Sequence, residues 1–198
     1  MGFLFALGVV LTIAITFAII KGGNDKKELA ENEKKIRTFL SENDLRANHI
    51  IFTPHNNSNN SLSVNEKKKT ISICHIKNDN VFVDNYSFDQ VIGFDIDIDG
   101  ESARKITVGG IIAGAALGGG LGALIGSQFG GKKSKVNLMH LVINVDDMSN
   151  PVIHFSILKP SFDGKPYNSD HFMVAEASKK AEKWSGIFKV ILNRKVTE

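Results

Sequence analysis

Three patterns of apolar residues follow one another along the chain. Phe3 to Ile20 is an unbroken apolar run without charge, which is long enough to span a bilayer core of about 30 Å. Between residues 49 and 158, short segments carry apolar residues at every second position, the spacing of a half-buried β-strand. After Ser169 the spacing changes to that of a helix. The chain therefore combines a membrane element, a set of strands and a terminal helix.

The first run predicts an uncleaved transmembrane anchor over residues 1–22. A cleaved signal peptide is the alternative, but it would carry basic residues before its apolar run and small residues at its end. Here Lys21 is the first basic residue, and Phe17–Ile20 is a poor cleavage site. Basic residues favour the cytoplasmic side of a span, and those near this span all follow it. We therefore expect an inner-membrane protein with its N-terminus outside and its main domain in the cytoplasm.

A stalk helix is predicted over residues 25–46. Asp25 can cap it, with Glu28 three residues further on, which is the arrangement of a capping box. The apolar face of this helix is narrow. It comprises Leu29, Ile36, Phe39 and Leu40. Such a face predicts packing against the domain that follows, and it is too short to predict a coiled coil.

The alternating segments predict a mostly antiparallel sheet. A first strand over His49–Thr53 is expected to stop at Pro54, and residues 56–61 are predicted to form an Asn/Ser loop. Further strands are expected at Leu62–Val64, Thr70–Ile76, Val81–Val83, Gln90–Ile98, Val136–Val145 and Val152–Leu158. Short strands followed by one helix form an α+β plan.

The C-terminal helix is predicted over residues 170–193, with Ser169 as its N-cap. Apolar residues recur there at helical spacing. They are Ala177, Ala181, Trp184, Phe188 and Ile191. We expect this stripe to cover the open face of the sheet. The alternative is a basic helix at a membrane interface, with Trp184 at the level of the lipid headgroups.

A glycine-rich segment interrupts the strands between residues 106 and 131. Six glycines recur at every fourth position: Gly110, Gly114, Gly118, Gly122, Gly126 and Gly130. Residues four apart share one face of a helix, and a row of glycines lets a second backbone approach closely. In water each glycine costs a helix about 1 kcal/mol relative to alanine. The segment is therefore predicted to pack as a glycine zipper, in lipid or against protein.

This insert is predicted to be a helical hairpin that turns at Gly118–Gly120. Strands of one sheet precede and follow it, so the chain must return to the side from which it left. Each arm measures about 18 Å, which is too short to span a bilayer. Basic residues bracket the insert and suit an anionic membrane surface. They are Arg104, Lys105, Lys132, Lys133 and Lys135. The alternatives are a hairpin packed on the domain or on a second copy, and a true second span.

Composition excludes several classes of function. A net charge of +3 is too small to indicate a nucleic-acid partner. The single cysteine, Cys74, fits a reducing compartment and has no second cysteine with which to build a zinc site. The glycine-rich segment lacks the Lys or the third glycine that phosphate-binding loops need at fixed offsets. No cofactor is expected.

The run Asp95–Gly100 matches the start of a calcium-binding loop, D-x-D-x-D-G. That loop needs a bidentate Glu at position 12, and the chain has Ile106 there. The residues between the aspartates are isoleucines, which gives strict two-residue alternation. A strand with an acidic outer face explains this better than a metal site.

No catalytic group is expected either. Cys74 and His75 are neighbours on a predicted strand and so point to opposite faces. The six histidines are scattered, one to an element, without metal-ligand spacing on a helix. We therefore predict no catalytic residue, no metal site and no enzyme activity.

The order of the motifs resembles a known group of proteins. Leu62–Val64, Tyr86–Ile92 and Phe94–Gly100 come first, followed by the glycine-rich insert, a long strand region with Asn150–Val152, and the helix. The chain resembles uncharacterised bacterial and phage membrane-anchored proteins with a pleckstrin-homology-like domain, in which Tyr-x-Phe-x-x-Ile precedes a strand and a glycine-zipper insert splits the barrel. The resemblance covers residues 48–193. It implies a domain in two parts, residues 48–105 and 132–195, around the insert at 106–131, and it implies no activity.

Together these features predict a non-enzymatic, membrane-anchored binding or adaptor module at the cytoplasmic face, with its zipper hairpin in or on the membrane. The expected partners are membrane lipid and, through the zipper, a second copy or another protein. The alternative is a membrane-perturbing effector, of the phage-exclusion or stress-toxin type, that acts through self-association of the zipper.

Overall fold

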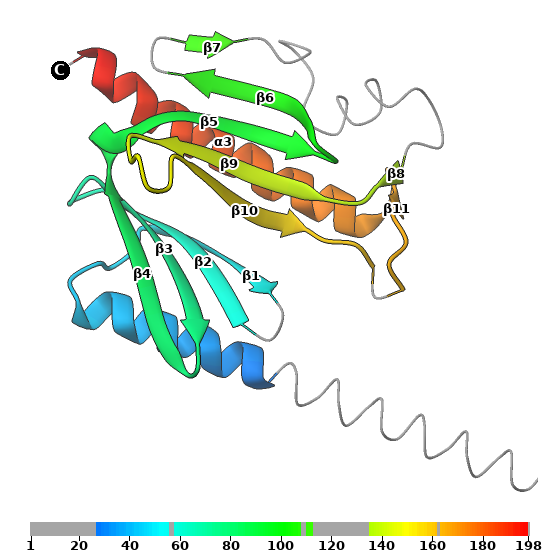
Figure 1. Cartoon of the computed structure of the whole chain (residues 1–198), viewed down its shortest axis with the longest axis horizontal. Coiled ribbons are helices and arrows are strands. Elements are labelled where there is room, and N and C mark those ends of the chain that lie inside the picture. Colours follow the sequence, from blue (N-terminus) through cyan, green and yellow to red (C-terminus); the bar gives the residue numbers. More distant parts are fainter. Residues whose placement is uncertain (1–26, 56–57, 108–109, 113–134, 162, 198) are drawn as a thin grey trace, which may run out of the picture. The chain divides into compact units, whose positions relative to one another are not determined.

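The computed structural model describes residues 27–55, 58–107, 110–112, 135–161 and 163–197. The chain divides into two compact units, Met1–Asn85 and Tyr86–Glu198, each of which combines antiparallel strands with a helix (Figure 1). The predicted α+β class with antiparallel sheets and a C-terminal helix is therefore confirmed. The predicted anchor over residues 1–22 lies outside the described residues. Among those described, no helix is both long and apolar enough to cross a membrane.

The first unit contains a four-stranded sheet in the order β1-β2-β3-β4. Its strands are β1 (His49–His55), β2 (Ser58–Asn65), β3 (Thr70–Lys77) and β4 (Asn80–Ser87). Residues 27–42 form a helix that buries Ile36 and Leu40 against Cys74 and Ile76 of β3. The helix ends before the predicted residue 46 because Asp44 adopts a left-handed φ of 58°, which terminates a helix.

Two predictions about the first strands are wrong. β1 continues through Pro54 to His55, because β1 is an edge strand and the missing N–H of proline costs least at an edge. β2 begins at Ser58, so residues 58–61 are strand rather than loop. A polar sequence can form a strand because the ladder uses backbone groups, and Asn60 lies opposite Thr53 in β1. The segments predicted as strands at Leu62–Val64 and Thr70–Ile76 pair as the β2–β3 hairpin, which turns after Asn65.

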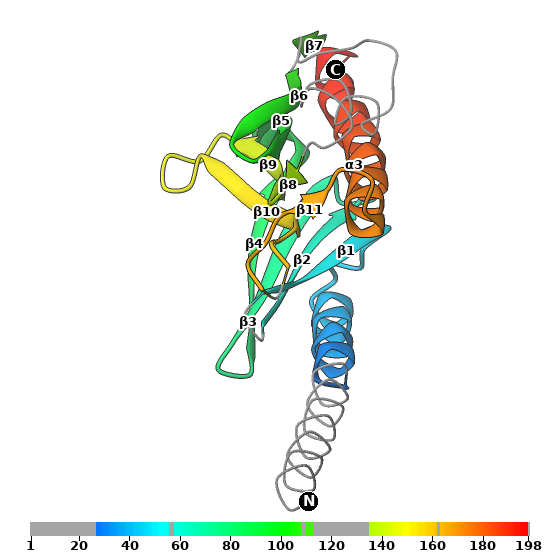
Figure 2. The same cartoon turned by 90° about the vertical axis from the view of Figure 1, so that its right-hand side faces the viewer.

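The second unit contains a five-stranded sheet in the order β10-β9-β5-β6-β7. Its strands are β5 (Val91–Ile98), β6 (Glu101–Thr107), β7 (Gly110–Ile112), β9 (Met139–Val145) and β10 (Val152–Leu158). A short 3-10 helix, η1 (Phe88–Gln90), precedes β5. The helix α3 (Phe172–Thr197) lies along one face of this sheet (Figure 2).

The apolar stripe of α3 covers the sheet as predicted. Phe188 is fully buried and stacks on Phe94 of β5, with ring centroids 4.5 Å apart. Trp184 is only 2% exposed, so it does not lie at a membrane interface. The predicted N-cap, Ser169, is wrong: the helix begins at Phe172, and His171 Nδ1 accepts the backbone N–H of Met173.

The strand predicted over residues 136–145 is broken. A short β8 (Lys135–Val136) pairs with β11 (Tyr167–Asn168), and β9 begins only at Met139. At the break, the Asp99 carboxylate accepts the backbone N–H groups of Asn137 and Leu138, with Leu138 N at 2.7 Å. Because these two N–H groups bond to a side chain instead of to a neighbouring strand, the strand is interrupted at Asn137 and Leu138.

The helical hairpin predicted over residues 106–131 does not begin at Ile106. β6 runs to Thr107 and pairs with β7, so Gly110 lies opposite Thr107 in a β-hairpin. Ile106 is buried, and Ile111 lies opposite it in the register. The prediction of a helix is therefore wrong for residues 106, 107 and 110–112, whose strand pairing extends the sheet. Residues 113–134 of the insert lie outside the described part of the chain.

Candidate functional site

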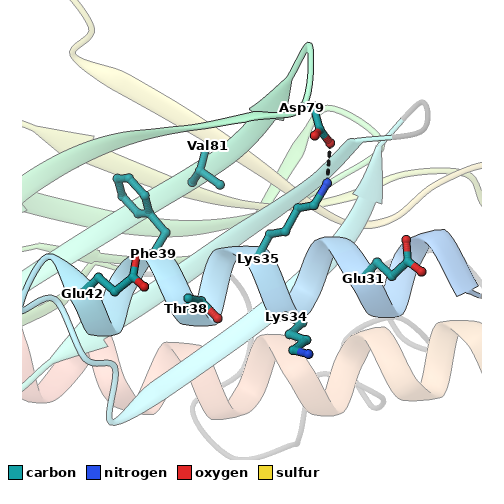
Figure 3. Close-up of a pocket in the computed structure, with 8 residues that line it drawn as sticks. All are labelled: Glu31, Lys34, Lys35, Thr38, Phe39, Glu42, Asp79 and Val81. Carbon is teal, nitrogen blue, oxygen red and sulfur yellow. Dashed lines mark hydrogen bonds and ion pairs between the residues drawn. The ribbon is translucent and has the colours of Figure 1, made fainter.

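A groove of about 500 Å³ lies beside the helix of residues 27–42 in the first unit (Figure 3). It is lined by Glu31, Lys34, Lys35, Thr38, Phe39, Glu42, Asp79 and Val81. The first six come from the helix, and the last two come from the β3–β4 turn and from β4. The groove is open to solvent rather than enclosed, so it is suited to a segment of a partner.

The groove arises because the helix has a narrow buried stripe. Ile36 and Leu40 are buried, whereas Phe39 and Val81 are only partly buried. Both residues of the β3–β4 turn, Asn78 and Asp79, have positive φ, which is typical of a tight hairpin turn. The turn brings Asp79 to the helix, where it forms an ion pair with Lys35.

The groove offers an apolar floor and a rim of mixed charge. Figure 3 shows the Phe39 ring pointing away from the helix and lying beside Val81, with the Lys35–Asp79 ion pair further along the groove. Two lysines and three carboxylates line it, which gives a formal charge of −1. Such a surface can accept an apolar side chain flanked by charged groups.

Cys74 lies beneath the same helix and is not a nucleophile. Its side chain is fully buried, and burial raises the pKa of its thiol to about 11. A thiol with such a pKa stays protonated at neutral pH, and only the thiolate is reactive. His75 is partly buried and stacks on Phe82, with ring centroids 5.3 Å apart. The two neighbours are thus in different surroundings, as their strand position predicts.

The structure brings together a pair in the second unit that sequence reasoning missed. His140 Nδ1 and Ser156 Oγ are hydrogen-bonded at 2.9 Å across β9 and β10. Burial lowers the pKa of His140, and the nearby Asp97 carboxylate opposes this in part. His154 lies edge-on to the same ring, with centroids 5.9 Å apart. Only the β9–β10 register, which pairs residues 16 apart in sequence, would have revealed the contact.

The pair does not form a catalytic triad in the described residues. A triad needs a carboxylate hydrogen-bonded to the histidine ring to fix its orientation. Within the described ranges no such bond reaches His140, and the Asp97 carboxylate instead accepts the backbone N–H of Gly100 at 3.1 Å. The Asp99 carboxylate is also used structurally, on Asn137 and Leu138. In the described ranges no three ligand-type side chains gather as a metal site would require.

The predicted zipper and basic residues are only partly described. Gly110 lies in β7, and the other five zipper glycines, Gly114, Gly118, Gly122, Gly126 and Gly130, lie outside the described residues together with Lys132 and Lys133. Arg104 and Lys105 belong to β6, and Lys135 is exposed at the start of β8. Packing of the zipper and a role of the basic residues at a membrane surface stay predictions.

Comparison with known proteins defines the class. Residues 49–159, more than half of the chain, match the family described as glycine zipper containing PH domain. The chain therefore belongs to this family, and the resemblance drawn from the order of its motifs is confirmed. The matched range includes the four-stranded sheet, the five-stranded sheet and the glycine-rich insert that interrupts the strands of the latter. No solved structure matches the chain.

Two curated relatives come from one phage lineage. An immunity protein of Bacillus phage SPbeta is 27% identical over 187 residues, which cover 88% of this chain and 88% of the relative. The SPbeta prophage-derived uncharacterized membrane protein YomJ of Bacillus subtilis (strain 168) is also 27% identical over 187 residues, covering 88% of this chain and 78% of the relative. The second name agrees with membrane association of this class of protein.

Proposed function

We propose that the protein is a non-enzymatic binding module that works at a membrane. The match to the glycine-zipper PH family carries this proposal, because a single family model covers both the domain and the glycine-rich insert. The name of one relative as a membrane protein supports it. The apolar run Phe3–Ile20 supplies the anchor, as the hydropathy of the sequence predicts.

In this proposal the anchor holds the domain at the cytoplasmic face, and the glycine-rich insert packs in or on the membrane. The groove beside the helix of residues 27–42 then faces the cytoplasm and receives a protein partner. Its apolar floor at Phe39 and Val81 supplies the contact area, and its mixed rim supplies selectivity.

A second candidate function is that of an effector in immunity. The name of the phage SPbeta relative favours it. In this case the zipper segments of several copies associate in the membrane and change its permeability. Small residues at spacing four allow such close helix contacts. The two candidates differ in whether the glycine row itself is the active surface.

Membrane topology tests the first part of the proposal. Gly2→Cys and Met148→Cys are made in the full chain, since Met148 is fully exposed in the second unit. Native Cys74 can stay, because its burial protects it. We expect an impermeant maleimide to label Gly2→Cys in intact cells and Met148→Cys only in inverted vesicles. Recovery of the protein in the soluble fraction, or labelling of Met148→Cys in intact cells, contradicts the proposal.

Zipper substitutions separate the two candidates. Gly114→Leu with Gly122→Leu fills the glycine row, and Ala115→Leu with Ala123→Leu adds the same bulk outside that row. An effector loses its effect on membrane permeability with the first pair and keeps it with the second. A binding module shows no permeability effect in the parent chain, and both pairs leave its topology unchanged. Dye release from energised cells, alongside labelling of Met148→Cys, measures the two properties together.

A further inference from the structure

A second pocket in the first unit is lined by groups that can bind an oxyanion. It measures about 270 Å³ and lies where the chain passes from the helix of residues 27–42 into β1. Its lining is Arg37, Leu40, Ser41, Arg46, Ala47 and Ile50. We propose that this pocket binds a phosphoryl group or a comparable dianion between its two arginines. The site does not depend on how the chain meets the membrane, so it stands or falls separately from the proposed function.

The loop that carries Arg46 is fixed at the end of the helix. Leu45 donates its N–H to the Leu40 carbonyl at 2.7 Å, and Asp44 donates to the Ser41 carbonyl at 3.4 Å. With the left-handed φ of Asp44, this is the hydrogen-bond pattern of a Schellman motif. The apolar contact that accompanies this motif is present too, because Leu45 packs against the cluster that contains Leu40.

The loop is also fixed where it enters the sheet. Asn48 donates its N–H to the Val64 carbonyl at 2.8 Å, and its side-chain oxygen accepts the N–H of Glu66 at 2.8 Å. An ion pair joins Asp44 to Lys68 across the same loop. Arg46 and Ala47 therefore lie on a segment tethered at both ends. A site on such a segment is ordered before its ligand arrives, which lowers the entropy cost of binding.

The two arginines are available to a ligand. The Arg37 guanidinium lies 4.8 Å from the centroid of the Phe52 ring, a cation–π contact that orients it and leaves its N–H groups available for hydrogen bonding. Within the ranges that the structure describes, neither Arg37 nor Arg46 has a carboxylate partner, whereas Lys35 and Lys68 of the same unit do. Both arginine residues are exposed.

Guanidinium chemistry defines the ligand class. Each guanidinium presents a planar set of N–H donors that matches the oxygens of phosphate or carboxylate. Two of them, with the Ser41 hydroxyl, favour a doubly charged group. Ala47 and Ile50 add apolar wall for the organic part of a ligand. The carbonyl end of the helix opposes an anion with about half a charge, which is less than the two full charges of the arginines.

Arginine side-chain NMR signals test the site directly. The full chain in detergent micelles is titrated with inorganic phosphate while the Nε–Hε signals of Arg37 and Arg46 are observed. We expect both signals to shift together along one binding curve. Arg37→Gln and Arg46→Gln should each weaken binding about tenfold or more, since each removes charge-assisted hydrogen bonds. Lys34→Gln, which removes the same charge from the same helix, should leave affinity within about twofold.

A second arm identifies the source of the ligand. The chain is placed in nanodiscs of phosphatidylcholine alone or with phosphatidic acid. If the Nε–Hε signals of Arg37 and Arg46 shift with free phosphate but not with phosphatidic acid, the ligand is soluble. If they shift with phosphatidic acid but not with free phosphate, the ligand is a lipid headgroup. Absence of shifts with both probes overturns the proposal. So does a loss of affinity in Lys34→Gln equal to that in Arg46→Gln, because general surface charge then explains the binding. Unchanged Trp184 fluorescence and Cys74 protection show that the variants are folded.

Discussion

The helices of the two units meet their sheets in different ways. Seven residues of α3 are at most 2% exposed: Val174, Ala177, Ala181, Trp184, Phe188, Ile191 and Leu192. The helix of residues 27–42 buries two apolar residues to that extent, Ile36 and Leu40. It gains its remaining contacts from the sheet's partly buried residues and from an ion pair at its rim. A wide apolar stripe holds a helix by burial alone, whereas a narrow one leaves a groove beside it.

The chain contains one probe for each unit. Trp184 is the single tryptophan and lies in the second unit, and Cys74 is the single cysteine and lies buried in the first. Trp184 fluorescence therefore reports unfolding of the second unit, and thiol labelling of Cys74 reports opening of the first. Comparison of the two signals shows whether the cores respond separately.

Phe188→Ala should have the largest effect. The ring is fully buried and stacks on Phe94, so its removal leaves a cavity that costs about 3–5 kcal/mol. The denaturation midpoint from Trp184 fluorescence should fall strongly, and Cys74 protection in native buffer should persist. Val190→Ala, at a residue that is 51% exposed on the same helix, should leave the midpoint nearly unchanged. Simultaneous loss of both signals in Phe188→Ala would show that the two cores unfold as one.

Asp99→Ala should have the next largest effect. It removes the acceptor for the N–H groups of Asn137 and Leu138, which should cost about 1–3 kcal/mol. Asp99→Asn keeps one side-chain acceptor and tolerates the left-handed φ of 54°, so it should retain much of that stability. Hydrogen exchange of the Asn137 and Leu138 amides measures the loss. Equal protection in parent and Asp99→Ala would show that these bonds add nothing.

Acidification should weaken the second unit through His140. Burial holds the pKa of His140 below its usual value, so the unfolded chain binds the proton more readily. Stability is therefore present above about pH 6.5 and is lost as the pH falls below it. Hydrogen bonds from Ser149 and Ser161 lower the pKa values of the Asp147 and Asp163 carboxyl groups. These groups are therefore protonated, and affect stability, only under more acidic conditions.

The window between about pH 7 and 5 consequently isolates the histidine. His140→Gln should flatten the pH dependence of the Trp184 midpoint over that window, while His49→Gln, in the first unit, should not. A slope that survives in His140→Gln would assign the effect to other groups.

Breaking the Lys35–Asp79 ion pair should have the smallest effect. Both side chains are substantially exposed, and such pairs contribute about 0–1 kcal/mol. A double-mutant cycle with Lys35→Gln and Asp79→Asn, followed by Cys74 labelling, should give a coupling energy in that range. A coupling well above it would mean that the charged rim, rather than burial of Ile36 and Leu40, holds this helix.

The predictable parts of the fold are those set by local patterns. The α3 stripe follows from helical spacing, and the β2–β3 hairpin follows from two alternating segments around the polar turn after Asn65. The break before Met139 does not, because it depends on Asp99, which lies 38 residues earlier than Asn137. The spacing of four predicts a helix at Gly110, and only the pairing of Gly110 with Thr107 distinguishes a β-hairpin from that helix.

The groove, the pocket and the His140–Ser156 contact could not be predicted from the sequence for a similar reason. The groove requires the turn at Asp79 to meet the helix at Lys35, and the pocket requires the loop at Arg46 to return beside Arg37. The His140–Ser156 contact requires a known register between two strands. Each joins residues whose separation in sequence carries no periodic signal, so packing alone reveals them.

The Asp99 carboxylate has a consequence for how this family can change over time. The Asp99 carboxylate accepts the N–H groups of Asn137 and Leu138, and the Asp99 N–H donates to the Leu138 carbonyl. These bonds hold together the two ends, here called the neck, of the excursion that the chain makes over residues 100–136. The sheet then depends on the neck and on β6 and β7, which lie within the excursion, and little on the length of the segment that follows β7, since doubling a loop costs only about 0.6 kcal/mol. Selection can therefore lengthen, shorten or replace the glycine-rich segment while the sheet of the second unit keeps its fold.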